Sequence, residues 1–158
     1  MEWLASLAVA LEASGFGQWA GRSAWAYPAA NVVHVFGIIL LIGGIGLVDL
    51  RILGVFPRLP LQPLSQALTP LAIAGLVLIA ASGIIMFAAD ARAMAASDMF
   101  QRKLVLILIA LANAAVFRLL HRGAGWIDRP PASARIMALA SLLLWLLVAA
   151  AGRMVAYS

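Results

Sequence analysis

The chain has 158 residues, of which 65% are hydrophobic and 11% are charged, and its formal net charge is +5. Ordinary soluble domains are roughly 45–50% apolar and 25% charged, so this composition excludes a typical water-soluble fold. The absence of cysteine excludes disulfides, thiolate metal sites and iron–sulfur clusters. The basic residues are scattered among the ends of apolar segments, which favours a membrane protein over a nucleic-acid-binding one.

The first residues predict an amphipathic helix over residues 2–14 that lies in the membrane interface. Apolar residues recur there at helical spacing and share one face, among them Trp3, Leu7 and Leu11. Acidic residues stand where a cleavable signal peptide would have basic ones, so we expect this segment to be retained.

Four apolar segments follow, each long enough to cross a bilayer as a helix. A hydrocarbon core ~30 Å thick needs about 20 residues at a rise of 1.5 Å each. We therefore expect spans over residues 28–50, 70–89, 99–120 and 132–155. Thr69 and Pro70 are expected to begin the second span as N-cap and first helical residue. The sequence predicts an all-α, integral membrane four-helix bundle that forms a single transmembrane domain over residues 1–158.

An even number of spans places both termini on one side of the membrane. Five basic residues fall on the side of the termini: Arg22, Arg92, Arg102, Lys103 and Arg153. Six fall on the other side: Arg51, Arg58, Arg118, Arg122, Arg129 and Arg135. Because the side richer in Lys and Arg is usually cytoplasmic, we expect both termini outside the cytoplasm.

His34 is the leading candidate for function, because ionisable groups inside membrane spans cost free energy. It lies roughly 9 Å below the outer boundary of the first span, and Gly37 and Gly44 share its face. Glycines permit the close approach of a neighbouring helix or of a flat ligand such as haem. Three roles stay open for His34: one hydrogen bond across the bundle, metal or haem ligation, and proton or quinone chemistry. His121 is not expected to join it, since the two rings would differ by ~20 Å in depth.

Methionines near the same level supply the expected partners of His34. Met86 lies near the outer end of the second span and Met154 near that of the fourth. Imidazole and thioether together suit Cu(I), and a His/Met pair also serves as an axial haem set. We therefore predict His34, Met86 and Met154 as ligands of copper or haem b, with Arg153 and Lys103 as contacts of the haem propionates. Methionine is also common filler in apolar interiors, which is the competing interpretation.

Other polar residues of the spans are predicted to hold the bundle together. Ser82 and Asn113 are expected to make polar contacts inside the membrane, because a mid-membrane amide usually bonds a neighbouring helix. Asp49, at the inner end of the first span, is expected to form an ion pair with Arg51 or with a basic residue of the third loop.

The first span and its flanks carry a recognisable pattern: Ser23-x-Trp25-x-Tyr27-Pro28, then His34, Gly37, Gly43 and Asp49-Leu50-Arg51-x-Leu53-Gly54. This pattern resembles an uncharacterised bacterial family of small four-span membrane proteins, and Ser82-Gly83 extends the resemblance. More remotely, the chain is similar to copper-resistance D-type membrane proteins and small b-type cytochromes. The resemblance implies a multi-pass protein of the bacterial inner membrane with a metal or haem role, and the count of basic residues places its termini in the periplasm.

We therefore expect a small membrane protein that handles copper or b-type haem near the outer leaflet and transfers electrons to a periplasmic or membrane redox partner. The alternative is a non-catalytic accessory subunit, in a larger complex or a homo-oligomer, surrounded by lipid. No G-x-S-x-G, Walker or H-E-x-x-H motif occurs, so a hydrolytic or phosphoryl-transfer enzyme is not expected.

Overall fold

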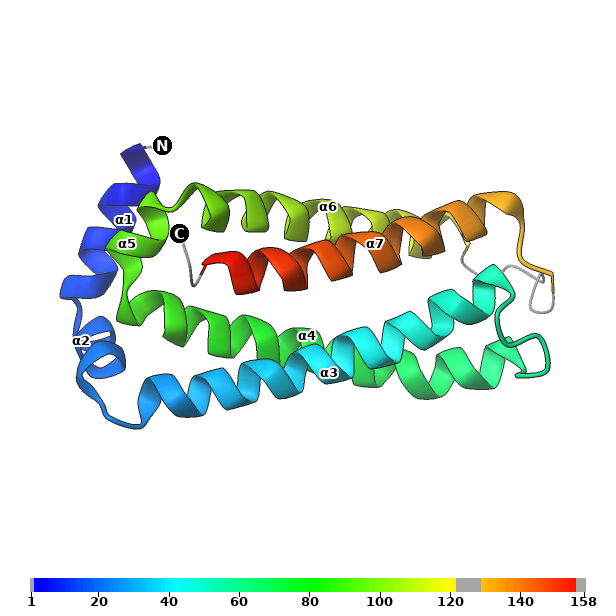
Figure 1. The fold of residues 1–158 in the computed structure, drawn as a ribbon, viewed down its shortest axis with the longest axis horizontal. Coiled ribbons are helices and arrows are strands. Elements are labelled where there is room, and N and C mark those ends of the chain that lie inside the picture. The colour runs from blue at the N-terminus through cyan, green and yellow to red at the C-terminus, as the bar shows by residue number, and fades with distance from the viewer. Residues whose placement is uncertain (1, 122–128, 156–158) are drawn as a thin grey trace.

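The computed structural model describes the backbone of residues 2–121 and 129–155, and side chains from residue 5 onward in these ranges. Every regular element in the described ranges is a helix. Four of these helices are long and apolar enough to cross a membrane: α3 (Ala26–Leu53), α4 (Leu61–Ala89), α6 (Asp98–Leu120) and α7 (Ala132–Met154). They run up and down in succession and place both termini at one end of the bundle (Figure 1). The predicted all-α four-helix membrane bundle is confirmed.

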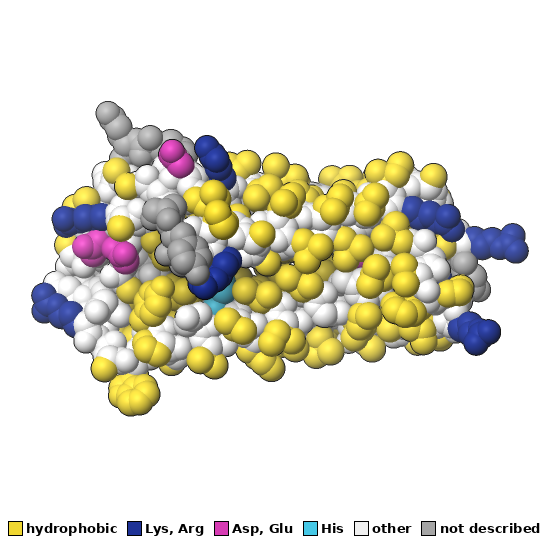
Figure 2. All heavy atoms as spheres, in the orientation of Figure 1, with side chains coloured by type: hydrophobic (Ala, Val, Ile, Leu, Met, Phe, Trp, Pro, Cys, Tyr) yellow, Lys and Arg dark blue, Asp and Glu magenta, His cyan; other side chains and the backbone are white. Residues whose placement is uncertain are grey.

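Side chains on the surface are sorted as a bilayer requires. Figure 2 shows apolar side chains along the middle of the bundle and most of the visible charged ones toward its two ends. The face in view therefore presents an apolar belt to lipid and charges to the headgroup zones.

α4 begins at Leu61, well before the predicted start at residue 70, and Pro70 lies inside the helix. Leu61 and Leu68 pack in a cluster with Val48 and Ile52 of α3. This packing favours a helix before Pro70, although the proline predicted that the helix would begin there. A proline removes one backbone hydrogen bond, a loss that membrane helices tolerate. The bounds of the other three spans differ from prediction by three residues or fewer.

Three short helices cover the end of the bundle that carries the termini: α1 (Glu2–Ala13), α2 (Gly15–Arg22) and α5 (Ala91–Ala96). α1 lies across the ends of the spans (Figure 1) and packs on α5 through the buried residues Ala8, Ala91 and Ala95. This position agrees with the predicted interfacial helix, although the side chain of Trp3 lies outside the described residues. α2 and α5 were not predicted.

α3 and α4 form the closest helix pair because glycines face each other. A Cβ built on Gly37 would lie 2.9 Å from the carbonyl oxygen of Gly75, and one built on Gly75 would lie 2.6 Å from that of Gly37. Gly44 continues the contact, with a Cβ position 3.0 Å from the carbonyl oxygen of Leu68. The glycines beside His34 therefore admit a neighbouring helix, one of the two roles that the sequence left open.

α7 joins the α3–α4 pair to α6, which is the outermost span. α3 contacts both α4 and α7, whereas α6 packs mainly on α7. All four helices meet near the middle of the bundle, where Leu41, Ala72, Ala110 and Trp145 form a buried cluster. Of the described residues in α6, only Ala110 is fully buried.

The glycine contact predicts opposite effects for two otherwise similar substitutions. Gly75→Ala places a methyl group against the α3 backbone and is expected to destabilise the fold by about 1–3 kcal/mol. Gly43→Ala is the matched control, because nothing lies within 4 Å of its Cβ position, and alanine gains about 1 kcal/mol in helix propensity. Thermal unfolding in detergent should give a lower Tm for the first variant and an equal or higher Tm for the second. Equal Tm values for both would contradict the packing described here.

Candidate functional site

His34 and Ser82 form a polar pair between α3 and α4. The imidazole Nδ1 lies 2.9 Å from the Ser82 hydroxyl oxygen, and Ser82 is only 2% exposed. His34 belongs to the face of α3 that includes the buried residues Ala30 and Gly37, so the glycine contact one turn away holds its ring against α4. A Cβ built on Gly83 would lie 3.5 Å from Cε1 of His34, which shows how closely the ring approaches α4.

The hydrogen bonds of Ser82 determine which nitrogen of His34 carries the proton. The hydroxyl lies 2.6 Å from the carbonyl oxygen of Leu78 and donates its single proton there, as serines in apolar helices commonly do. Ser82 then has only lone pairs to offer the ring, so Nδ1–H of His34 donates to it. In the neutral ring, Nε2 therefore carries a lone pair, and the backbone of Ile79 also hydrogen-bonds the ring.

Lys103 of α6 adds a positive charge to this end of the bundle. Its side chain is half-buried, and its ammonium acts electrostatically on the His34 ring. Gly152 of α7 leaves room for it, since a Cβ built there would lie 3.2 Å from Nζ. Ala138, Ser141, Ala149 and Gly152 form a stripe of small residues along α7 that indicates close packing in the sequence. The contact with Lys103 depends on how α6 and α7 pair.

The predicted methionine ligands occupy different positions relative to this pair. Met86 follows Ser82 by one turn of α4 and is half-buried, so it shares the face that carries Ser82. Met154 is 52% exposed and lies about 200° around α7 from Gly152, because successive residues are about 100° apart. The fold therefore brings Ser82 and Lys103 to His34, while Met154 turns away from the Lys103 contact.

His121 is separated from His34 as the sequence predicted. α3 and α6 run in the same direction, and the two histidines lie near opposite ends of the bundle (Figure 1). His121 bonds the Phe117 carbonyl at 3.1 Å and lies 3.3 Å from the Ser133 hydroxyl. A single group ligated by both histidines is excluded by this separation.

Asn113 connects two helices in the structure. Its side-chain Nδ2 donates to the backbone carbonyl of Met137 in α7 at 3.1 Å. Such bonds inside membranes contribute about 0.6 kcal/mol on average. Asn113 thus joins α6 to α7, and its amide nitrogen is already engaged.

The predicted ion pair between Asp49 and Arg51 is not formed. Residues two apart on a helix point in nearly opposite directions, which separates these side chains. The Arg51 guanidinium instead donates to the backbone carbonyls of Leu59 and Pro57, just beyond the turn that ends α3 at Gly54. Asp49 is hydrogen-bonded by Ser141 of α7. Arg122, a basic residue of the third loop, lies outside the described residues.

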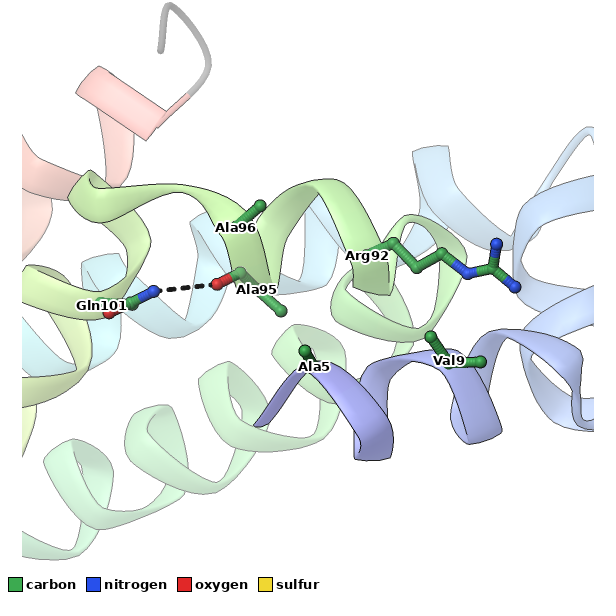
Figure 3. A pocket seen from close by; sticks show the side chains of 6 residues that line it. All are labelled: Ala5, Val9, Arg92, Ala95, Ala96 and Gln101. Carbon is green, nitrogen blue, oxygen red and sulfur yellow. Dashed lines mark hydrogen bonds between the residues drawn. The ribbon is translucent and has the colours of Figure 1, made fainter. Parts of the chain in front are cut away.

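A hollow of about 350 Å³ lies between α1, α5 and the start of α6 (Figure 3). Its walls are mostly small apolar side chains, and Arg92 and Gln101 are its polar residues. Gln101 donates to the Ala95 carbonyl at 3.0 Å, while Arg92 lies 3.8 Å from the Glu12 carboxylate. Because both polar groups have protein partners, this hollow lacks the convergent free groups typical of a binding site.

Within the part of the chain that the structure describes, no three histidine, aspartate or glutamate side chains gather as they would around a metal ion. The site is therefore one imidazole with an unprotonated Nε2, a serine that orients the ring, and an ammonium that acts on it. Such a site suits a ligand that needs a single protein donor atom.

A model of a family of unknown function, DUF6644, matches residues 7–158. Neither a curated protein nor a solved structure matches the chain.

The proton position on His34 can be tested directly by nitrogen-15 NMR. A His121→Gln variant leaves His34 as the one histidine, and its spectrum in the ligand-free protein should report protonated Nδ1 and unprotonated Nε2. Ser82→Ala in the same background removes the acceptor and should change the tautomer population. A protonated Nε2 in the first protein would contradict the assignment made from Ser82.

Proposed function

The chain belongs to the DUF6644 family, whose function is unknown, and we propose that it is a haem-binding membrane protein for one-electron transfer, in which His34 would hold the iron. The orientation of the His34 ring, with Nδ1–H held by Ser82 and the lone pair on Nε2, is the observation that carries this proposal.

The fit of His34 to this role rests on the orientation of its ring. A histidine that ligates a metal almost always donates its other N–H to a protein acceptor, which fixes the ring and raises its basicity. Ser82 provides that acceptor at 2.9 Å. Haem needs only one or two protein ligands, so the lack of a three-residue cluster among the described residues does not count against it.

The charge of Lys103 favours haem over a copper ion as the bound group. A bare cation at Nε2 would be repelled by an ammonium that already acts on the ring. Haem carries two propionates, which Lys103 and Arg153 in the last turn of α7 are suited to neutralise. Figure 2 shows a histidine side chain that reaches the surface next to a basic one, among hydrophobic neighbours. Met86, on the Ser82 face of α4, remains the candidate for a second ligand.

Each residue of the site has a distinct task in this proposal. Ser82 holds the His34 ring in one orientation, His34 supplies the donor atom, and Lys103 balances negative charge in a medium of low dielectric constant. When bound, haem would supply reversible one-electron chemistry, with its potential tuned by the residues that hold it. The electron partner is then a periplasmic protein or a membrane quinone.

An accessory subunit of a larger membrane complex is the competing function, and α6 is the observation that favours it. Ala110 is the one fully buried residue among those described in this span, so most of its apolar surface is available to another chain. Lipid covers such a surface equally well, so this surface supports the accessory role less specifically than the oriented histidine supports haem binding.

We further propose that the protein lies in a bacterial inner membrane with the His34 end of the bundle toward the periplasm. The termini share that end (Figure 1), and the other end carries the larger number of basic residues. A protease added to intact spheroplasts should remove tags fused to either terminus. Protection of both tags would show the opposite orientation, with the His34 end of the bundle toward the cytoplasm.

The proposed function predicts a visible spectrum for the purified full-length protein. The wild type should show a Soret band and stoichiometric haem. His34→Ala should lose both, whereas His121→Ala, which changes the other histidine, should keep them. Stoichiometric copper without a Soret band would show that the bound group is copper and not haem. A colourless, metal-free protein that co-purifies with fixed partners would support the accessory subunit.

The role of Ser82 can be tested by measuring how tightly a Ser82 variant binds haem. Ser82→Ala should weaken haem binding by about 10–100-fold, the usual effect of losing a group that orients a metal ligand. Ser65→Ala is the matched control, because Ser65 lies on the same helix and its hydroxyl is 3.3 Å from that of Thr69. Titration of the ligand-free variants with haemin, followed by absorbance, measures both affinities. If Ser82→Ala binds haemin as tightly as the wild type, the orientation of the His34 ring by Ser82 no longer supports haem binding.

A further inference from the structure

Asp49 is a buried carboxylate that the proposed haem site does not use. It is 5% exposed and lies near the end of α3 that is remote from the termini. Ser141 of α7 hydrogen-bonds its carboxylate, but Oδ2 has no hydrogen-bond partner. The side chain is thus more than nine-tenths buried and still has an oxygen atom without a partner.

No described cation neutralises this carboxylate. Arg51, on the same helix, donates to the loop carbonyls of Leu59 and Pro57. Arg135 of α7 and Arg118 of α6 are exposed. His121, also at this end, already contacts Phe117 and Ser133.

The remaining neighbours of Asp49 are apolar or neutral. α4, which packs along α3, has no ionisable residue, and the buried cluster at this end consists of Val48, Ile52, Leu61, Ala134 and Ala138. An unpaired charge in such surroundings is costly, so the carboxylate requires either a proton or a bound metal cation.

The oxygen atoms present favour a proton over a metal cation. Ca²⁺ takes six to eight oxygen ligands and Mg²⁺ six, whereas the side chains of Asp49 and Ser141 offer three oxygen atoms in all. A proton needs only the free Oδ2. The neutral acid also keeps the hydrogen bond from Ser141, because its other oxygen still accepts.

We propose that Asp49 is an intramembrane proton-binding site, which carries a proton on Oδ2 and exchanges it with the solution at the end of the bundle remote from the termini. Proton uptake converts the carboxylate to a carboxylic acid, and release restores it, with no other bond changed. The site is independent of the haem proposal, since Asp49 lies 15 residues from His34 along α3, roughly 22 Å at 1.5 Å per residue.

Infrared spectroscopy of the full-length protein in liposomes tests this proposal. At neutral pH the wild type should show a carboxylic acid C=O band that shifts in D₂O as the proton exchanges. Asp49→Asn, which preserves the side-chain shape, should lose the band. Asp90→Asn changes an exposed aspartate at the end of α4 and should keep it.

Ser141→Ala supplies a second variant that leaves Asp49 in place. Loss of the hydrogen bond from Ser141 should move the carboxylic acid band to higher frequency, which tests the assignment even if Asp49→Asn does not fold. Absence of the band from the wild type would overturn the proposal. A band that does not shift after hours in D₂O would also contradict the proposal, because the proton would then not exchange with the solution. Loss of the band when Na⁺ replaces choline would contradict it as well and would indicate a cation site at Asp49.

Discussion

The backbone contact between α3 and α4 at Gly37 and Gly75 is the constraint on which the rest of the structure depends. With no side chain on either residue, the helices approach closely enough for Ser82 to meet the His34 ring across their interface. A bulkier residue at either position would separate the helices and break a polar pair that lipid cannot replace. The glycines are therefore a condition for the histidine site, even though they leave no space for a ligand themselves.

The ionisable groups inside the bundle and the serines bonded to them are divided between its two ends. His34, Ser82 and Lys103 lie toward the end that carries the termini, and Asp49 with Ser141 lies toward the other. Between them, the cluster around Leu41 and Trp145 is apolar. Because a low dielectric medium strengthens charge interactions and penalises unpaired charges, each end is a separate chemical site, and the apolar middle insulates one from the other.

α7 contacts the polar side chains at both ends of the bundle. Gly152 makes room for the Lys103 side chain near one end, and Ser141 bonds Asp49 toward the other. Small residues on one face of α7 thus serve two functions, close packing and the accommodation of polar side chains from α3 and α6. Asn113 strengthens the same interface through its bond to Met137.

Composition and the length of the apolar segments determined by themselves that this chain is a four-span membrane bundle, because the thickness of a bilayer sets the length of a spanning helix. The periodicity of one helix also identified the face shared by His34, Gly37 and Gly44. The partners on other helices were decided only by the tertiary structure: Ser82 for His34, Ser141 for Asp49, and loop carbonyls for Arg51. Helical spacing tells which residues share a face, but it does not tell how adjacent helices are rotated and shifted against one another. Packing of glycine and alanine between helices sets that rotation, and a lone sequence contains no local signal for it.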